Sequence, residues 1–309
     1  MKGYKKAILY AFFIACLFLL ITAAIFNLIL RYYISDRRIR EFPFEISKVQ
    51  YPFLKSEIFP EISSKAVVIM DDESKTVLFA KNPNLSFSMA STTKIMTALV
   101  ALDYYKINDV LIVKKENVEG VNVGFEIGEK LNFPDILYAM LLPSGNDAAL
   151  VLAQNYRGGE KAFVAKMNEK AYELTLKNTN FADAIGLEDS RDYTTPLDLA
   201  RLASYALRNK IFADIVATKI KEIADVTGQK KYELRNLNKL LGASGVNGVK
   251  TGYTNEAGQV LVTSKIEIDE NNKEHTLIIV VMDSLDRFSD TSKLLNSVAG
   301  NINYLSIHP

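Results

Sequence analysis

A long uncharged segment near the N-terminus constrains the fold of this chain more than any other feature. Residues 7–30 contain no Asp, Glu, Lys or Arg, and their main polar members are Thr22 and Asn27. Because about 20 consecutive apolar residues suffice for a helix to cross a bilayer, we expect a transmembrane signal anchor here, preceded by a cytoplasmic tail at residues 1–6. A cleaved signal peptide would have a shorter apolar core, and this segment continues past the weak cleavage site at residues 22–24.

The remaining sequence has the composition of one globular domain. The protein has 309 residues, of which 49% are hydrophobic and 24% charged, and its net charge is +1. This balance gives no indication of nucleic-acid binding. We expect residues 31–60, which are charged and aromatic and contain several prolines, to form a stalk, and residues 61–309 to form the folded domain. Basic residues lie on both sides of the uncharged segment, so charge does not settle which side of the membrane the domain faces.

Cysteine and histidine are too scarce for several kinds of site. The only cysteine, Cys16, lies inside the uncharged segment, which excludes intrachain disulfides and a cysteine-based metal site. The two histidines, His275 and His308, argue against a multi-histidine zinc site and against a serine triad that depends on histidine. We therefore expect no metal or other cofactor. A serine hydrolase built on this sequence would have to use lysine as its base.

The order of the expected elements indicates an α+β fold. Apolar runs around an acidic turn predict a β-hairpin over residues 66–80, helical patterns fill residues 134–178, and β-rich runs return after residue 222. A closing amphipathic helix is expected over residues 290–304. The sheet should therefore be antiparallel, collect strands from both ends of the domain, and be flanked by helices, with a helical lobe inserted in the middle.

A serine and a lysine lie three residues apart where a buried helix is expected to begin. Residues 95–102 are apolar and contain no Gly or Pro, which predicts a helix with Ser91 in its first turn. Side chains three residues apart share a helix face, so Lys94 can reach the Ser91 hydroxyl. A serine needs a nearby base to act as a nucleophile, and burial lowers the pKa of a lysine enough for that role. Taken alone, a helix cap and a solvent-exposed lysine explain this pattern better.

The turn at residues 143–147 contains a second hydroxyl and an amide. The Ser144 hydroxyl could relay a proton to a leaving group, and the Asn146 amide could hold a substrate carbonyl or the lysine amine. An ordinary turn between two helices, capped by Asn146 or Asp147, explains the same residues. The turn therefore gains a functional interpretation only in combination with the other motifs.

A strand is expected over residues 248–254. On it, Lys250 would be a fixed cation near the site, Thr251 a hydroxyl for a carboxylate, and Gly252 a point where a substrate backbone can approach closely. An extended peptide could pair along this edge as an added strand. A charged edge strand that resists aggregation would contain the same residues.

In combination, the three motifs are far more specific. S-x-x-K, S-G-N and K-T-G begin at Ser91, Ser144 and Lys250, and this set is close to the motifs of penicillin-binding proteins and class A β-lactamases, with S-G-N in place of S-D-N. The chain resembles the D-alanyl-D-alanine carboxypeptidases, which are low-molecular-mass penicillin-binding proteins of the serine-peptidase type. The resemblance runs from about residue 60 to about residue 300. Its clearest segments are residues 89–98, 141–149, 180–200 and 248–258.

The resemblance implies a β-lactamase/transpeptidase-like fold and a role for each motif residue. Ser91 would be acylated by the substrate, with Lys94 as the general base and Ser144 as the proton shuttle. Asn146 would position the lysine and the substrate. The backbone N–H groups of Ser91 and Tyr253 would form the oxyanion hole. The residues implied to bind substrate are Asn146, Lys250, Thr251, Gly252, Tyr253 and Arg287.

Arg287 is implied to lie near the terminal carboxylate of the substrate. A guanidinium group suits a carboxylate because it can make a two-pronged contact. A surface ion pair at the start of a helix is the competing explanation for this arginine.

The function implied by the resemblance is a serine D,D-carboxypeptidase anchored in the cell membrane through residues 7–30, with its catalytic domain outside the cytoplasm. Its substrates would be peptidoglycan stem peptides ending in D-Ala-D-Ala, and β-lactam antibiotics would inhibit it. The alternatives are a D,D-endopeptidase, a β-lactamase, and a catalytically silent penicillin-binding scaffold. Class A β-lactamases use a glutamate for deacylation, and only a partial match to its motif begins at Glu173.

The chain departs from its relatives at several places. Relatives often have Asn-Pro where this chain has Asp183 and Ala184, which leaves the shape of that loop open, and often have Asp where it has Asn247. Many relatives carry a C-terminal β-domain and an amphipathic membrane helix, whereas this chain ends near the end of the catalytic domain. We therefore expect its N-terminal segment to take over the anchoring.

Overall fold

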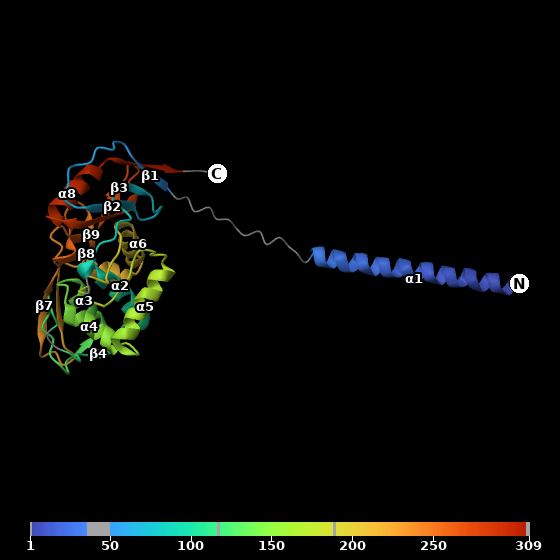
Figure 1. Ribbon diagram of the computed structural model, residues 1–309, viewed down its shortest axis with the longest axis horizontal. Helices are drawn as coiled ribbons and strands as arrows, with labels where there is room; N and C mark the ends of the chain where they lie inside the picture. Colours follow the sequence, from blue (N-terminus) through green and yellow to red (C-terminus); the bar gives the residue numbers. More distant parts are fainter. Residues whose placement is uncertain (1, 36–49, 116–117, 188–189, 307–309) are drawn as a thin grey trace. The chain divides into compact units, whose positions relative to one another are not determined.

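The computed structural model describes residues 2–35, 50–115, 118–187 and 190–306. The chain divides into two compact units, residues 1–47 and 48–309, and the elements of both are labelled in Figure 1. The described residues of the first unit form helix α1 (Lys2–Ser35), which contains the segment predicted as an anchor. No helix in the described part of the chain combines the length and the apolar character needed to cross a bilayer.

The second unit contains strands at both ends and helices in the middle. Its strands are β1 (Gln50–Leu54), β2 (Ala66–Asp71), β3 (Val77–Lys81), β4 (Val110–Ile112), β5 (Lys130–Asn132), β6 (Ile220–Ala224), β7 (Lys231–Arg235), β8 (Val246–Thr254), β9 (Gly258–Ile268), β10 (Glu274–Ser284) and β11 (Ile302–Ser306). Its helices are the short 3-10 turn η1 (Ala90–Thr93), α2 (Lys94–Tyr104), α3 (Phe133–Leu141), α4 (Asn146–Asn155), α5 (Gly159–Glu173), α6 (Pro196–Leu207), α7 (Lys210–Val216) and α8 (Arg287–Val298).

A five-stranded antiparallel sheet with the order β3-β2-β10-β9-β8 forms the centre of this unit. β2 and β3 form the predicted first hairpin, and they join the C-terminal strands where Val68 of β2 pairs with Val280 of β10. Helices α2–α7 come from the intervening sequence. The predicted α+β architecture, a sheet assembled from both ends with a helical lobe inserted between them, is confirmed.

Both faces of the central sheet are covered. In β2, Val68 and Met70 pack into the core shared with the helical lobe, whereas Val67 and Ile69 pack into the core shared with α8. Figure 1 shows α8 on one side of the sheet and α2–α6 on the other. Successive side chains of a strand point to opposite faces. A strand covered on both faces is therefore apolar throughout, which explains the continuous apolar runs of β2 and β10.

The two ends of the folded unit pair with each other. β1 lies inside the segment predicted as a stalk, yet it forms an antiparallel pair with β11, so the fold begins before the predicted boundary at residue 61. Residues 36–49 of the predicted stalk lie outside the described residues. The closing helix ends at Val298 instead of residue 304. The reason is that Gly300 has a φ of +66°, which a right-handed helix cannot contain, and the chain then continues into β11.

One carboxylate ties the start of the folded unit to the start of α8. Buried Asp290 accepts hydrogen bonds from the hydroxyls of Ser63, Ser64 and Ser284 at 2.7, 2.6 and 2.7 Å, and from the backbone N–H groups of Ser63 and Ser64 at 3.0 and 2.8 Å. Burial acts to raise the pKa of Asp290, but these donors outweigh it and lower the pKa to about 2.

Asp290→Asn should lower the free energy of unfolding by on the order of 1–3 kcal/mol, because the amide presents a donor to groups that are themselves donors. The pKa of Asp290 lies below its ordinary value, so its stabilising contribution is present above about pH 4 and is lost as the pH falls through about 2. Chemical denaturation of wild type and variant should therefore give a constant difference between about pH 7 and 5 that shrinks toward pH 2. A difference that persists undiminished at low pH would contradict this account.

Candidate active site

Ser91 lies in a tight turn that leads from the sheet region into the helical lobe. The turn is η1, and α2 begins only at Lys94, so the predicted helix starts one turn later than expected. Thr92 stabilises the turn, since its backbone N–H and its hydroxyl both donate to the Met89 carbonyl, at 3.1 and 2.6 Å. Ala90 has a φ of +47°, a conformation that residues other than glycine rarely adopt. The half-buried Ser91 side chain is thus held on an unusual and well-fixed piece of backbone.

The Lys94 amine has three neighbours of defined hydrogen-bonding character. Its Nζ lies 3.0 Å from Ser91 Oγ, 2.7 Å from Asn146 Oδ1 and 2.8 Å from the carbonyl oxygen of Ile185. The orientation of the Asn146 amide follows from its Nδ2, which donates to the Glu119 carbonyl at 2.6 Å. The two carbonyl oxygens can only accept, so they take the two hydrogens of a neutral amine and leave its lone pair facing Ser91. This geometry suits proton transfer from the serine to the lysine.

The surroundings of Lys94 bring its pKa close to neutrality. The side chain is fully buried. Burial lowers the pKa of Lys94 from its ordinary value to about 7, while the negative charges of Asp183 and Asp147 act in the opposite direction. A substantial fraction of the molecules therefore holds a neutral amine at pH 7. The predicted role of this lysine as a base has a physical basis in its burial.

Ser144 lies in the turn between α3 and α4, where the sequence placed it. Its φ is +68°, it is buried, and its Oγ has no hydrogen-bond partner within the described part of the chain. The next residue must be small, because a Cβ on Gly145 would lie 2.8 Å from both the Ala139 carbonyl oxygen and a methyl group of Val123. A buried hydroxyl without a partner is unfavourable in the ligand-free protein. It remains available to a substrate or a leaving group.

Asp147, at the start of α4, organises the segment beside the lysine. Its buried carboxylate accepts hydrogen bonds from the backbone N–H groups of residues 123–125 and of Ala148 at 2.8–3.2 Å. The segment held in this way continues from Glu119, whose carbonyl orients the Asn146 amide. Asp147 therefore acts on the lysine through this backbone as well as through its charge.

β8 forms the edge of the sheet next to Ser91, as the K-T-G motif predicts. A Cβ added to Gly252 would lie 3.2 Å from the Ala90 Cβ and the Met89 carbonyl oxygen, and 3.3 Å from the backbone nitrogen of Ser91. Gly252 therefore lets β8 pack against the turn that carries the serine, and its predicted role in admitting a substrate backbone stays a prediction. The outer edge of β8 pairs with none of the other described strands, so an extended peptide can add there.

Lys250 and Thr251 are both buried in β8. The Lys250 Nζ donates to the Thr251 carbonyl at 3.0 Å. Burial, followed by the positive charges of Lys94 and Arg287, lowers the pKa of Lys250 well below its ordinary value. The lowered pKa opposes the expectation that Lys250 is a fixed cation, and its charge beside a substrate stays a prediction. A negatively charged substrate group beside it would favour its protonated form.

Arg287 and Tyr253 lie beside the same strand. Arg287 begins α8, its Nη1 donates to the Gly252 carbonyl at 2.6 Å, and its buried Nε has no partner among the described residues. Tyr253 is exposed and donates from its hydroxyl to Asn255 at 3.2 Å. Both residues line a recess of about 560 Å³ next to β8. Arg287 is thus placed at the predicted substrate-binding strand, and its contact with a substrate carboxylate stays a prediction.

Three contributors to the site were not identified from the sequence. Ile185 and Glu119 act through backbone carbonyls, and the type of a side chain gives no signal for such a role. Asp147 stands next to the S-G-N motif, but an acidic residue in the first turn of a helix has an ordinary explanation as a stabiliser of the helix end. The closely spaced Gly120 and Gly124 were the available sign that a backbone segment wraps around this carboxylate.

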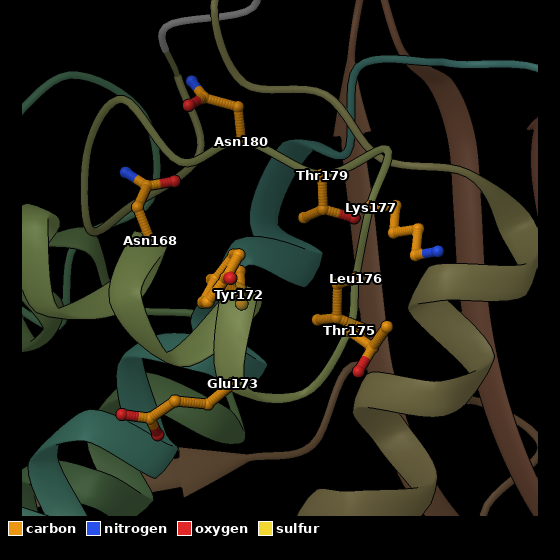
Figure 2. Close-up of a pocket in the computed structure, with 9 residues that line it drawn as sticks. Asn168, Tyr172, Glu173, Thr175, Leu176, Lys177, Thr179 and Asn180 are labelled. Carbon is orange, nitrogen blue, oxygen red and sulfur yellow. The ribbon is translucent and has the colours of Figure 1, made fainter.

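A separate cavity of the folded unit lies away from these residues. It has a volume of about 650 Å³ and lies between the end of α5 and residues 175–180 (Figure 2). Several of its polar side chains are already used by the fold: the Asn168 amide bonds to the backbone of Phe181, and Thr179 bonds to Asp198. None of the lining residues belongs to the predicted site. The cluster around Ser91 therefore remains the candidate active site.

The chain is similar to known proteins over most of its folded unit. Residues 54–285 match the protein family Peptidase S11, described as D-alanyl-D-alanine carboxypeptidase. The D-alanyl-D-alanine carboxypeptidase DacF of Bacillus subtilis is 36% identical over 209 residues, which are 65% of this chain and 54% of that protein. The chain thus spans little more than half the length of this relative.

Two further similarities concern an endopeptidase and a solved structure. The D-alanyl-D-alanine endopeptidase of Pseudomonas aeruginosa is 35% identical over 208 residues, 65% of this chain and 67% of that protein. The crystal structure of the Streptomyces K15 DD-transpeptidase superposes with a TM-score of 0.71 and 31% identity, and the match covers 78% of this chain and 98% of that one.

Proposed function

Because this chain belongs to the Peptidase S11 family of D-alanyl-D-alanine carboxypeptidases, we propose that it removes the terminal D-alanine from peptidoglycan stem peptides. One observation carries the proposal. The buried amine of Lys94 lies 3.0 Å from Ser91 Oγ, and the Asn146 and Ile185 oxygens accept from its other side. A base with a pKa near the working pH, in hydrogen-bond contact with a serine, is what an acyl-enzyme mechanism requires.

The proposed reaction proceeds through an ester on Ser91. Ser91 Oγ attacks the carbonyl carbon of the penultimate D-alanine, and its proton passes to neutral Lys94. The peptide C–N bond breaks, and the amine of the departing D-alanine receives a proton by way of Ser144. Water then attacks the ester carbon and gives a proton to Lys94, the C–O bond to Ser91 breaks, and Ser91 Oγ takes that proton as the shortened peptide leaves with a new carboxyl group. The backbone N–H groups of Ser91 and Tyr253 stabilise the oxyanion that forms in both steps.

The edge of β8 supports a binding site for the substrate backbone. An extended stem peptide would pair along this edge, close to the Ser91 turn that Gly252 allows the strand to contact. The recess lined by Tyr253 and Arg287 lies beside the same edge, and the buried Arg287 Nε is still free to donate within the described residues. Lys250 and Thr251 supply a cation and a hydroxyl for the anionic end of the substrate.

A D,D-endopeptidase is the second candidate, because the relative from Pseudomonas aeruginosa carries that name at 35% identity. The same residues would cleave a cross-link in place of a terminal residue. Release of free D-alanine from a pentapeptide, compared with cleavage of a cross-linked dimer, distinguishes the two activities.

The proposal includes a location. The support is the uncharged segment at residues 7–30 of the sequence and the position of peptidoglycan outside the membrane, since the basic residues on both sides of the segment do not indicate its orientation. We place the catalytic unit on the outer side of the cell membrane, with this segment as its anchor.

A fluorescent penicillin should label the full-length protein in membranes, and Ser91→Ala should abolish the label, since β-lactams are attacked by the same serine. Mass spectrometry should locate a single adduct on the peptide that contains Ser91. The adduct should be long-lived, because no complete motif for a deacylating glutamate is present in the sequence. Rapid turnover of penicillin without a trapped adduct would favour a β-lactamase, and equal labelling of Ser91→Ala would refute the assignment of the nucleophile.

The same labelled cells test the location. Protease added to intact cells after removal of the wall should digest the labelled unit, and alkaline extraction should leave the label in the membrane fraction. Protection of the label from protease would contradict an outer location.

A further inference from the structure

The loop at residues 183–187 is folded around one carboxylate. Asp183 Oδ1 accepts from the backbone N–H groups of Ile185 and Gly186 at 2.6 and 2.5 Å, and Oδ2 accepts from Leu187 at 3.1 Å. A carboxylate that accepts three successive N–H groups closes a tight turn and fixes the direction of the carbonyls within it. The Ile185 carbonyl of this turn is the one that accepts from Lys94 at 2.8 Å.

The same loop is attached to the helical lobe on either side of Asp183. The Thr97 hydroxyl, on α2, donates to the Ala184 carbonyl at 2.7 Å. The backbone N–H of Ala182 donates to Asp192 Oδ1 at 2.7 Å. The loop is therefore fixed against the helix that begins at Lys94. Removing the charge of Asp183 can leave the backbone conformation of the loop unchanged.

We propose that Asp183 is a positioning residue for acylation: its turn aims the Ile185 carbonyl at Lys94, and its negative charge acts on the amine that takes the Ser91 proton. The inference rests on the role of Lys94 as the base in the proposed function. It concerns a residue outside the three motifs and makes a claim about the pH dependence of the reaction.

Charged groups face Lys94 from three elements. Asp147 lies at the start of α4, Lys250 lies on β8, and Asp183 belongs to the 183–187 loop. Burial lowers the pKa of Lys94, and Asp183 is the first of the two carboxylates that oppose this effect, ahead of Asp147. After burial, the positive charges of Lys94 and Arg287 also lower the pKa of Lys250.

Asp183 makes two contributions, the hydrogen bonds that hold the turn and the negative charge, and different substitutions remove them separately. Ile185 and Gly186 need an acceptor at the position of Oδ1, which the carbonyl oxygen of an asparagine also provides. An asparagine therefore keeps the acceptor for Ile185 and Gly186, gives up the longer contact of Oδ2 with the Leu187 N–H, and removes the charge. An alanine removes both the charge and the turn.

The test is the pH profile of the second-order rate of Ser91 acylation by a fluorescent penicillin, measured from about pH 5 to 9. In Asp183→Asn, loss of the negative charge makes the ammonium form of Lys94 less favourable, so the acid limb should move to lower pH by on the order of half a unit to one unit. Below the wild-type midpoint, the variant should react on the order of threefold to tenfold faster than wild type. In Asp183→Ala, the maximum rate should also fall, because the Ile185 carbonyl is no longer held in place.

Asp192→Asn is the matched control. Asp192 is also buried and also holds the backbone of this loop, through Ala182, but the carboxylates that act on the pKa of Lys94 are Asp183 and Asp147. The acid limb of the acylation-rate profile of Asp192→Asn should therefore coincide with that of wild type. An equal shift in Asp192→Asn would show that loosening of the loop, not charge, is responsible, and would overturn the proposal.

An acid limb of Asp183→Asn that stays in place or moves to higher pH would also overturn it. If Asp183→Asn fails to fold, Asp183→Ser takes its place, since a short hydroxyl side chain can accept from the same N–H groups without a charge. A failure of the proposed function would look different. The wild-type protein would then show no labelling of Ser91 at any pH, and no pH profiles could be compared.

Discussion

Replacing Lys94 with arginine should reduce the rate of Ser91 acylation by penicillin by on the order of a hundredfold to ten-thousandfold, the range typical for loss of a general base. A guanidinium remains protonated at every pH at which the protein is folded, so it cannot take the serine proton. It is also too large for a fully buried position whose three neighbours lie at 2.7–3.0 Å. The measurement is the rate of acylation across pH, with thermal unfolding as a check that the variant is folded.

Lys250→Arg is the informative comparison. Lys250 is also buried and close enough to Lys94 to feel its charge, but it has no assigned part in proton transfer. A permanent charge there should hold Lys94 in its neutral form and leave measurable acylation, with weaker binding because the larger side chain displaces the substrate. Near-normal acylation in Lys94→Arg would show that another group is the base. Equal loss in both variants would show that the pocket tolerates no arginine, and Lys94→Met would then decide whether an amine is needed.

Gly186→Ala should cause the second large loss, although residue 186 contacts no substrate in the proposed mechanism. Its φ is +83°, and a Cβ would lie 2.0 Å from the carbonyl oxygen of Ala90 and 2.8 Å from Thr93 Oγ1. Backbone must therefore move in the turn that carries Ser91. A displacement of about 1 Å in such a turn costs on the order of a hundredfold in rate, and the clash should lower the free energy of unfolding by about 1–3 kcal/mol beyond the cost of the positive φ.

Gly128→Ala separates the cost of the positive φ from the effect of the clash. Gly128 has a φ of +84°, almost the same conformation, but a Cβ there would have nothing within 4 Å. Both variants share the cost of placing an alanine at positive φ, about 1–2 kcal/mol, and differ only in the clash. Acylation rates and unfolding temperatures of the two variants, measured side by side, should differ strongly. Similar values for both variants would mean that the contact between the 183–187 loop and the Ser91 turn affects neither acylation nor stability.

The architecture and the three motif positions could be predicted from the sequence because their signals are local. The apolar run after Ser91 predicts a buried helix, the Pro143 turn predicts a break between two helices, and the order of strands and helices predicts an inserted lobe. Each of these rests on periodicity or on turn chemistry within a few residues. The structure confirms the helices, the turn and the sheet at those places.

The parts that could not be predicted depend on contacts between distant segments. The strand at residues 50–54 forms because it has a partner at residues 302–306, and neither segment shows that on its own. The protonation state of Lys250 depends on burial in β8 and on two cations from elsewhere in the chain. Gly252 is explained by the turn that packs on it, not by the strand that contains it. Such effects belong to tertiary structure and leave no periodic trace in the sequence.

The pairing of β2 with β10 joins residues that are roughly two hundred positions apart in the chain. During synthesis, which proceeds from the N-terminus, the hairpin β2–β3 emerges long before its neighbour in the sheet, with apolar side chains on both faces and nothing to cover them. A contact of such high sequence separation forms late because a long loop must close first. Lys250 arrives with the same late strands, so Ser91 and Lys250 come together only when the last strands of the central sheet are present. The unfinished chain therefore needs protection from aggregation until the last strands of the sheet arrive, and the proposed site around Ser91 is incomplete until the sheet closes.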